Sequence, residues 1–157
     1  MNANTILAEL ESKRAAGWTL PRLKELALHL GLDGHVTFLG AVSDERLRLL
    51  YQECDVFALP SKGEGFGIVF LEAMRQGKPC IGGNHGGTPE VIEHGVDGYI
   101  VNYGDVEQLA HYLVEFFHKP ELRRHMGLKG YQKVKASYLF SRMRNDWFDL
   151  LDGALGR

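Results

Sequence analysis

Two glutamates stand at the ends of an apolar run, and their spacing limits the chemistry they could perform. Glu64 and Glu72 bracket the segment EGFGIVFLE. We expect a helix to begin near Phe66, which puts Glu64 just before its N-terminus and Glu72 about two turns along from Glu64. At about 1.5 Å of rise per residue, their backbones would lie roughly 9 to 12 Å apart along the axis. That is too far for two carboxylates sharing one proton, but it suits two carboxylates that hold different parts of one elongated ligand.

The stretch between the two carboxylates predicts what that ligand carries in its middle. A helix N-terminus offers N–H groups and a positive dipole end, both of which favour phosphate. Carboxylates accept hydrogen bonds from hydroxyl groups. A ligand with hydroxyls at both ends and phosphate between them fits this pattern, and a sugar nucleotide has that layout. The spacing alone is also compatible with a loop glutamate and a helix-surface glutamate that bind nothing.

Short apolar strands alternate with helices along the chain, and these elements would position the two carboxylates. Nearly continuous apolar strands separated by helices are typical of a parallel sheet covered on both faces, the doubly wound, Rossmann-like α/β arrangement. Its ligands bind outside the carboxyl ends of the strands, where the glycine-rich loops 61–67 and 82–90 lie. We expect four strands, over 35–40, 55–60, 78–83 and 98–101, and helices over 20–31, 43–54, 67–77, 88–95, 106–117, 119–135 and 141–154.

One of these helices has a clear apolar stripe. Within 106–117 the apolar positions recur at helical spacing, which indicates an amphipathic helix. The stripe consists of Val106, Leu109, Ala110, Leu113, Val114 and Phe117.

Length and composition are those of one globular domain. The chain has 157 residues, 45% of them hydrophobic and 24% charged, which is normal for a soluble protein. No apolar run reaches the roughly 18 to 20 residues of a membrane span, and no signal-peptide layout opens the chain, so we predict a cytoplasmic protein. Cys54 and Cys80 have no CxxC spacing, and the seven histidines form no HExxH pair. We therefore expect neither a disulfide nor a bound metal.

Charge is unevenly distributed along the sequence. Residues 122–145 contain seven lysines and arginines and no acid, in a chain whose net charge is −2. Such a segment predicts either a solvated helix face or a surface for an acidic partner or anionic lipid, which would be a peripheral contact at the inner membrane face. The pI of about 6.4 argues against a nucleic-acid partner.

The motifs DVFALPSKGEGFGIVFLEAMRQGKPCI, GGTPEVI and GVDGYIV, taken in order, resemble a known family. They are similar to the nucleotide-sugar-binding half of a retaining glycosyltransferase of the two-domain GT-B type, specifically glycosyltransferase family 4 (group 1). The similarity extends from about Leu20 to about Phe148, and the two glutamates with seven residues between them are its most specific part. The resemblance implies sugar transfer from a nucleoside-diphosphate donor with retained anomeric configuration, without a metal or other cofactor.

The resemblance also implies roles for individual residues. Glu64 would lie by the hydroxyls of the transferred sugar; we name it the catalytic position without treating its carboxylate as a nucleophile. Glu72 would accept the ribose hydroxyls. The other expected donor-binding residues are Phe66 and Gly67 for the sugar, Ile68 and Val69 for the diphosphate, Val42 and Ser43 for the nucleobase, and Gly86, Gly87 and Thr88 for the pocket floor.

The chain departs from the family's pattern upstream. Residues 1–19 are predicted to form a helical extension, and 20–157 a donor-binding domain that lacks its first strands, a basic Arg…Lys pair and the acceptor domain. We therefore expect the chain alone to be inactive, with an open sheet edge that pairs with a second copy or with a polypeptide carrying the acceptor half. Two alternatives stay open: a non-catalytic nucleotide-sugar-binding or assembly module, and a truncated fragment without independent activity.

Overall fold

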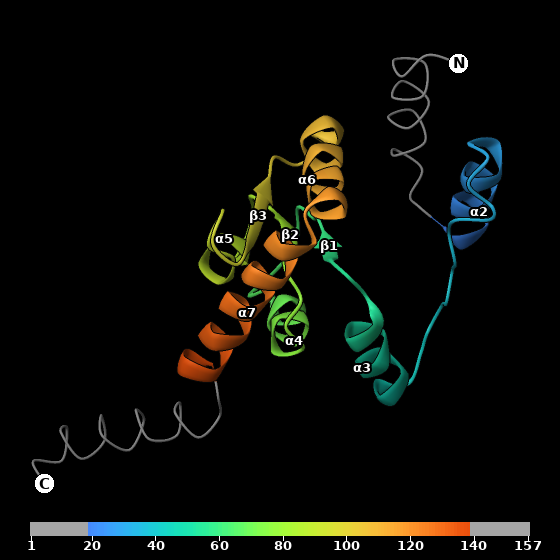
Figure 1. Cartoon of the computed structure of the whole chain (residues 1–157). Coiled ribbons are helices and arrows are strands. Elements are labelled where there is room, and N and C mark those ends of the chain that lie inside the picture. Colours follow the sequence, from blue (N-terminus) through green and yellow to red (C-terminus); the bar gives the residue numbers. More distant parts are fainter. Residues whose placement is uncertain (1–18, 139–157) are drawn as a thin grey trace, which may run out of the picture. The chain divides into compact units, whose positions relative to one another are not determined.

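The computed structural model describes residues 19–138 and divides into two units, Met1–Ser43 and Asp44–Arg157, which we treat separately (Figure 1). In the first unit, α2 (Leu20–His29) has Pro21 in its first turn, where a missing N–H costs nothing. The helix expected over 141–154 lies outside the described residues, as do residues 1–18 of the extension expected over 1–19.

Residues 35–40 do not form the predicted strand. The N–H groups of His35 and Val36 donate to the Leu32 carbonyl, at 2.9 and 3.0 Å, and the chain then runs on without regular structure. Leu39 is 49% exposed. A strand needs a neighbour for its backbone hydrogen bonds, and no strand among residues 19–138 pairs with this segment. The strand prediction for 35–40 is therefore wrong for the described part, because an apolar run forms a strand only where a neighbouring strand accepts its backbone hydrogen bonds.

The second unit is built on a parallel sheet. Its strands are β1 (Phe57–Leu59), β2 (Cys80–Gly83) and β3 (Gly98–Val101), in the order β1-β2-β3. Phe57 pairs with Cys80, and Cys80 with Gly98. The central strand is buried along its whole length, as its apolar sequence predicts for a parallel sheet. The α/β, Rossmann-like prediction is confirmed, with three described strands instead of the four expected.

Helices cover both faces of this sheet. Successive side chains of β2 point to opposite faces, so that Cys80 belongs to one core cluster with Phe70, while Ile81 belongs to the other with Phe116. The helices are α3 (Asp44–Glu53), α4 (Ile68–Arg75), α5 (Thr88–Val91), α6 (Val106–His118) and α7 (Pro120–Ser137). Phe70 belongs to α4 and Phe116 to α6, so these two helices lie on opposite faces of the sheet (Figure 1).

Of the apolar stripe predicted for 106–117, only Leu109 lies on the face by which α6 packs. Leu109, Tyr112 and Phe116 face the sheet, while Val114 and Phe117 are 54% and 75% exposed. The contacts with β3 account for this rotation. The Tyr99 and Tyr112 rings stack with centroids 3.9 Å apart, and Tyr99 Oη donates to Glu115 Oε2 at 2.7 Å. Much of the apolar side of α6 is thereby left without a partner among the described residues.

Part of the basic segment is used inside the domain. Arg123 pairs with Asp55 at 3.1 Å, and Lys133 pairs with Asp97, whose side chain is fully buried. Lys133 Nζ also donates to the Val91 carbonyl at 3.1 Å, so α7 is tied to the end of α5. No helix in residues 19–138 is both long and apolar enough to cross a membrane.

Two glycines let α7 approach the element that carries Glu72. A Cβ added to Gly127 would stand 2.0 Å from the Gly77 carbonyl oxygen, in the turn that follows α4. A Cβ added to Gly130 would stand 2.9 Å from Met74 Cγ, at a flexible side chain of α4 itself. This close packing fixes the position of α4 against the rest of the unit.

These contacts predict that replacing Gly127 of α7 by alanine destabilises the protein, the opposite of the usual effect in a helix. Replacing glycine by alanine inside a helix normally stabilises it by roughly 0.5–1 kcal/mol. Gly127→Ala should instead lower the free energy of unfolding by about 1–3 kcal/mol, because a backbone atom blocks the new methyl group. Urea unfolding of the full chain measures this change, and Gly130→Ala, which meets a side chain that can move, should cost less. A higher urea midpoint for Gly127→Ala would contradict the packing described.

Candidate functional site

The loop after β1 enters α4 through a left-handed residue. The helix begins at Ile68, one or two residues after the start expected at 66–67, and its N-cap Gly67 has φ +86°. Residues with a Cβ rarely adopt this conformation, so glycine allows the sharp entry. No side chain caps the N-terminus of α4. The first-turn amides of a helix have no carbonyl partner within it, which makes this end suited to an anion.

The two glycine-rich loops meet through their backbones. The Gly87 N–H donates to the Gly65 carbonyl at 2.7 Å. A Cβ on Gly86 would stand 1.8 Å from the Glu64 carbonyl oxygen, and one on Gly87 would stand 2.8 Å from Phe66 Cα. The structure thus brings the 64–66 segment together with residues 86–87, as a shared site requires. Glu64 is half-buried and Phe66 is exposed.

Buried polar atoms gather near the carboxyl ends of β1 and β2. Ser61 Oγ, His85 Nδ1 and Thr88 Oγ1 are buried and have no hydrogen-bond partner among the described residues. Ser61 follows β1, while His85 and Thr88 follow β2. Buried polar groups are normally paired, so a cluster of exceptions is a functional hint. It lies at the strand ends where ligands of doubly wound folds bind.

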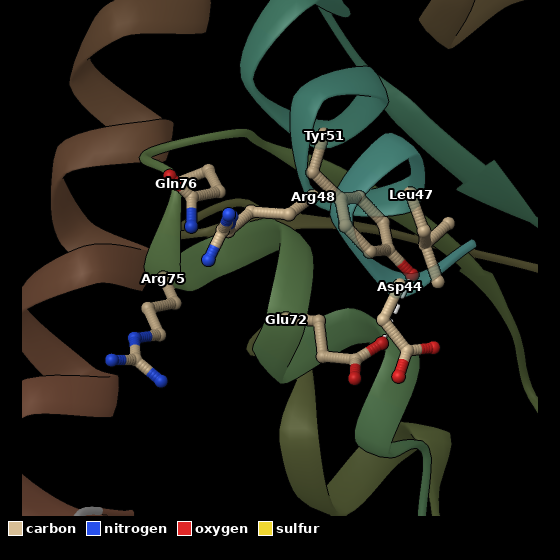
Figure 2. Close-up of a pocket in the computed structure, with 7 residues that line it drawn as sticks. All are labelled: Asp44, Leu47, Arg48, Tyr51, Glu72, Arg75 and Gln76. Carbon is tan, nitrogen blue, oxygen red and sulfur yellow. Dashed lines mark hydrogen bonds between the residues drawn. The ribbon is translucent and has the colours of Figure 1, made fainter.

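Glu72 lines a separate hollow between α3 and α4 (Figure 2). Its volume is about 290 Å³. Both walls carry charge, and Figure 2 shows the Arg75 side chain pointing away from the Glu72 carboxylate. The lining residues are Asp44, Leu47, Arg48 and Tyr51 from α3, Glu72 and Arg75 from α4, and Gln76, which caps the C-terminus of α4.

A tyrosine from α3 bonds to the Glu72 carboxylate. Tyr51 Oη donates to Glu72 Oε2 at 3.2 Å, and this bond is drawn in Figure 2. Burial of the phenol, followed by the nearby negative charge of Glu72, raises the pKa of Tyr51 to about 12. The hydroxyl therefore stays protonated across the working range of most enzymes and acts there as a donor to the carboxylate.

Sequence reasoning missed the α3 side of this hollow. Asp44, Arg48 and Tyr51 sit in an ordinary amphipathic helix, and no local motif distinguishes them from surface residues. Only the packing of α3 against α4 brings them to Glu72. The residues predicted for the nucleobase, Val42 and Ser43, are exposed and belong to the other unit, Met1–Ser43, so they are described apart from the Glu72 hollow.

Among residues 19–138, no group of three or more His, Cys, Asp or Glu side chains is arranged to hold a metal ion. Cys54 and Cys80 are free thiols. Burial is the main cause that raises the pKa of both, so neither is an activated thiolate. The available groups are carboxylates that accept hydroxyls and backbone amides that receive an anion.

The sequence matches a described protein family. Residues 16–133 match the profile of the family "Glycosyl transferases group 1". Two curated relatives are a GDP-mannose-dependent alpha-(1-6)-phosphatidylinositol monomannoside mannosyltransferase of Mycobacterium tuberculosis, 35% identical over 85% of this chain, and an N-acetyl-alpha-D-glucosaminyl L-malate synthase of Bacillus anthracis, 34% identical over 81%. The chain covers 37% and 34% of their lengths, about a third of each.

Solved structures of the same family have the same fold. Anabaena HepE in complex with UDP superposes with a TM-score of 0.78 at 27% identity, covering 85% of this chain and 36% of that one. The C-terminal domain of the group 1 protein LpcC from Francisella tularensis superposes with a TM-score of 0.71 at 28% identity, covering 76% and 62%. Fold, motifs and family profile agree. The chain therefore belongs to the group 1 glycosyltransferase family, and it corresponds to the family's C-terminal domain, of GT-B type.

Proposed function

We propose that this chain is the donor-binding part of a retaining glycosyltransferase and binds a nucleoside-diphosphate sugar. One arrangement carries the proposal: the uncapped N-terminus of α4 lies between Glu64, in the preceding loop, and Glu72, one turn into the helix. It supplies an anion site with a hydroxyl acceptor on either side. Structural relatives include HepE solved with UDP and with UDP-glucose, which supports a donor of this class.

The donor would lie along the loop and the first turn of α4. Glu72 would accept the ribose hydroxyls, and the amides of Ile68 and Val69 would face the diphosphate. Glu64 would lie by the hydroxyls of the transferred sugar. The remaining assignments are Phe66 and Gly67 for the sugar, Gly86, Gly87 and Thr88 for the pocket floor, and Val42 and Ser43 for the base.

The proposed chemistry uses fixed dipoles in place of a metal or another cofactor. Negative charge develops on the diphosphate as the bond to the sugar breaks, and a helix N-terminus aimed at it stabilises that charge without reorganising. Glu64 would orient the sugar while this occurs.

Donor affinity tests the proposal directly. Glu72→Ala should weaken binding of the nucleotide by about tenfold or more, because each charge-assisted hydrogen bond it removes is worth about 1.5–3 kcal/mol. Calorimetry with UDP, GDP, UDP-glucose and GDP-mannose measures this loss. Glu107→Ala, which removes an exposed glutamate at the start of α6, is the matched control and should bind as the parent does. If the parent chain binds none of the four ligands, the proposed function is wrong.

Catalysis is proposed to need a second half, because the relatives are about three times as long as the matched part. We infer that it comes from a second copy of the chain or from a polypeptide carrying the acceptor side. Two observations support a partner surface in the second unit. β1 has β2 as its only described strand neighbour, and the apolar side of α6 around Phe117 is exposed. Because the chain covers only about a third of the length of these relatives, it is also compatible with two alternatives. One is a donor-binding module without catalytic activity, and the other is a fragment without independent activity.

Light scattering and nucleotide release test the partner requirement. With the chain alone, nucleotide should be released from the donor no faster than from the donor in buffer without protein, because no acceptor half is present. If a second copy covers α6, the chain should be a dimer or larger, and Phe117→Glu should shift it toward the monomer. Lys129→Glu, at an exposed site on α7, is the charge control. Donor turnover by a strict monomer would contradict the requirement for a partner.

We also infer a cytoplasmic protein that contacts the inner membrane face through its basic segment. Lys129 and Lys135 are exposed on α7, which supports a contact with anionic lipid. Co-sedimentation with phosphatidylserine vesicles should fall when both lysines are replaced by glutamine, since each basic residue near such a surface is worth about 1 kcal/mol. Neutral phosphatidylcholine vesicles are the control. Equal sedimentation with both lipids would contradict an electrostatic contact.

A further inference from the structure

We propose that Tyr51 is a positioning residue for Glu72: its hydroxyl holds the carboxylate in the orientation that receives the two neighbouring ribose hydroxyls of the donor. The inference rests on the proposed function and deepens it. It gives α3 a part in binding the donor, although α3 lies outside the EGFG…LEA segment.

The phenol is held by the core, so its hydroxyl has a fixed place. Tyr51 is 7% exposed. Its ring meets Phe57 edge-on at 5.4 Å between centroids, and Phe57 meets Phe70 at 5.6 Å. Glu72, by contrast, is an exposed side chain on a helix and would otherwise sample several rotamers. Freezing such a side chain on binding loses conformational entropy, and the Tyr51 bond would remove part of that loss before the ligand binds.

The bond leaves the carboxylate free for the ligand. An ionised carboxylate offers about four lone-pair sites, and the Tyr51 hydroxyl occupies one of them, on Oε2. Oε1 and the second site on Oε2 remain to accept two hydroxyls from adjacent carbons. Because burial keeps Tyr51 protonated, it donates to Glu72 and does not repel it.

A second link lies beside the first and provides a matched control. Gln52 Nε2 donates to Oε1 of Gln76, the C-cap residue of α4, at 3.3 Å, so α3 bonds to Glu72 within α4 and also to the end of that helix. Gln52 is the residue next to Tyr51, but its bond does not involve Glu72. Removing the Gln52 side chain weakens the contact between the helices but leaves the bond from Tyr51 to the Glu72 carboxylate in place.

The test compares one substitution with one change in the ligand. Tyr51→Phe keeps the ring and removes only the hydroxyl. The ligand is whichever of UDP and GDP the parent binds more tightly, measured by calorimetry against its 2′,3′-dideoxy analogue. Tyr51→Phe should weaken binding of the ribonucleotide about fivefold to tenfold and leave binding of the dideoxy analogue within twofold, because that analogue has no hydroxyls for Glu72. Gln52→Ala should change neither affinity by more than twofold.

The outcomes separate this inference from the function on which it rests. If the parent chain binds neither nucleotide, the proposed function fails, and this inference with it. If the parent binds and Tyr51→Phe binds the ribonucleotide as tightly, only the positioning role is wrong. Equal loss for both ligands would show a purely structural effect and would also overturn it. In a Glu72→Ala background, Tyr51→Phe should have no further effect on affinity, and a urea midpoint for each variant confirms that it is folded.

Discussion

The close approach of two backbones, after β1 and after β2, is the constraint on which the candidate site depends. The Gly87 N–H bonds to the Gly65 carbonyl, and no Cβ fits at Gly86 or Gly87 where these loops touch. Each loop leads into a helix, α4 in one case and α5 in the other. One hydrogen bond between loops therefore sets the N-terminus of α4 and the position of Glu64 with respect to the central strand. A side chain at either glycine would push the two strand ends apart.

The rest of the unit holds α4 from its other sides. Tyr51 bonds to Glu72 from α3, and Gly127 of α7 packs on the turn that follows α4. α7 is itself tied to the end of α5 through Lys133. The helix that carries Glu72 is thus fixed from several sides, which is what a carboxylate needs if it is to meet a ligand in a defined geometry. Phe66 and Ile68, which we propose to contact the donor, are exposed at the N-terminal end of α4.

Local pattern predicted most of the second unit because its elements are complete within short stretches of sequence. Apolar runs indicated β1, β2 and β3, and glycine spacing indicated the loops that meet at Gly65 and Gly87. Pattern failed where the outcome depends on a distant partner. Residues 35–40 have the sequence of a strand but no described neighbour. α6 packs on the sheet through Tyr112 and Phe116 as well as Leu109, and it meets Tyr99 of β3 there. The role of Tyr51 could not be predicted for the same reason, because the sequence of α3 does not indicate that Tyr51 will contact Glu72.

The helix that holds α4 in place, α7, is synthesised long after α4 itself. Every strand pairing among residues 19–138 lies between Phe57 and Val101, so the described strands are all synthesised before α7. α4 cannot be fully held until Gly127 and Gly130 arrive, more than fifty residues after Glu72. A nascent chain can therefore contain all the residues of the EGFG…LEA motif while α4, which carries Glu72, still lacks its contacts with α7. The motif is made early, but the packing that holds its helix in place is completed late.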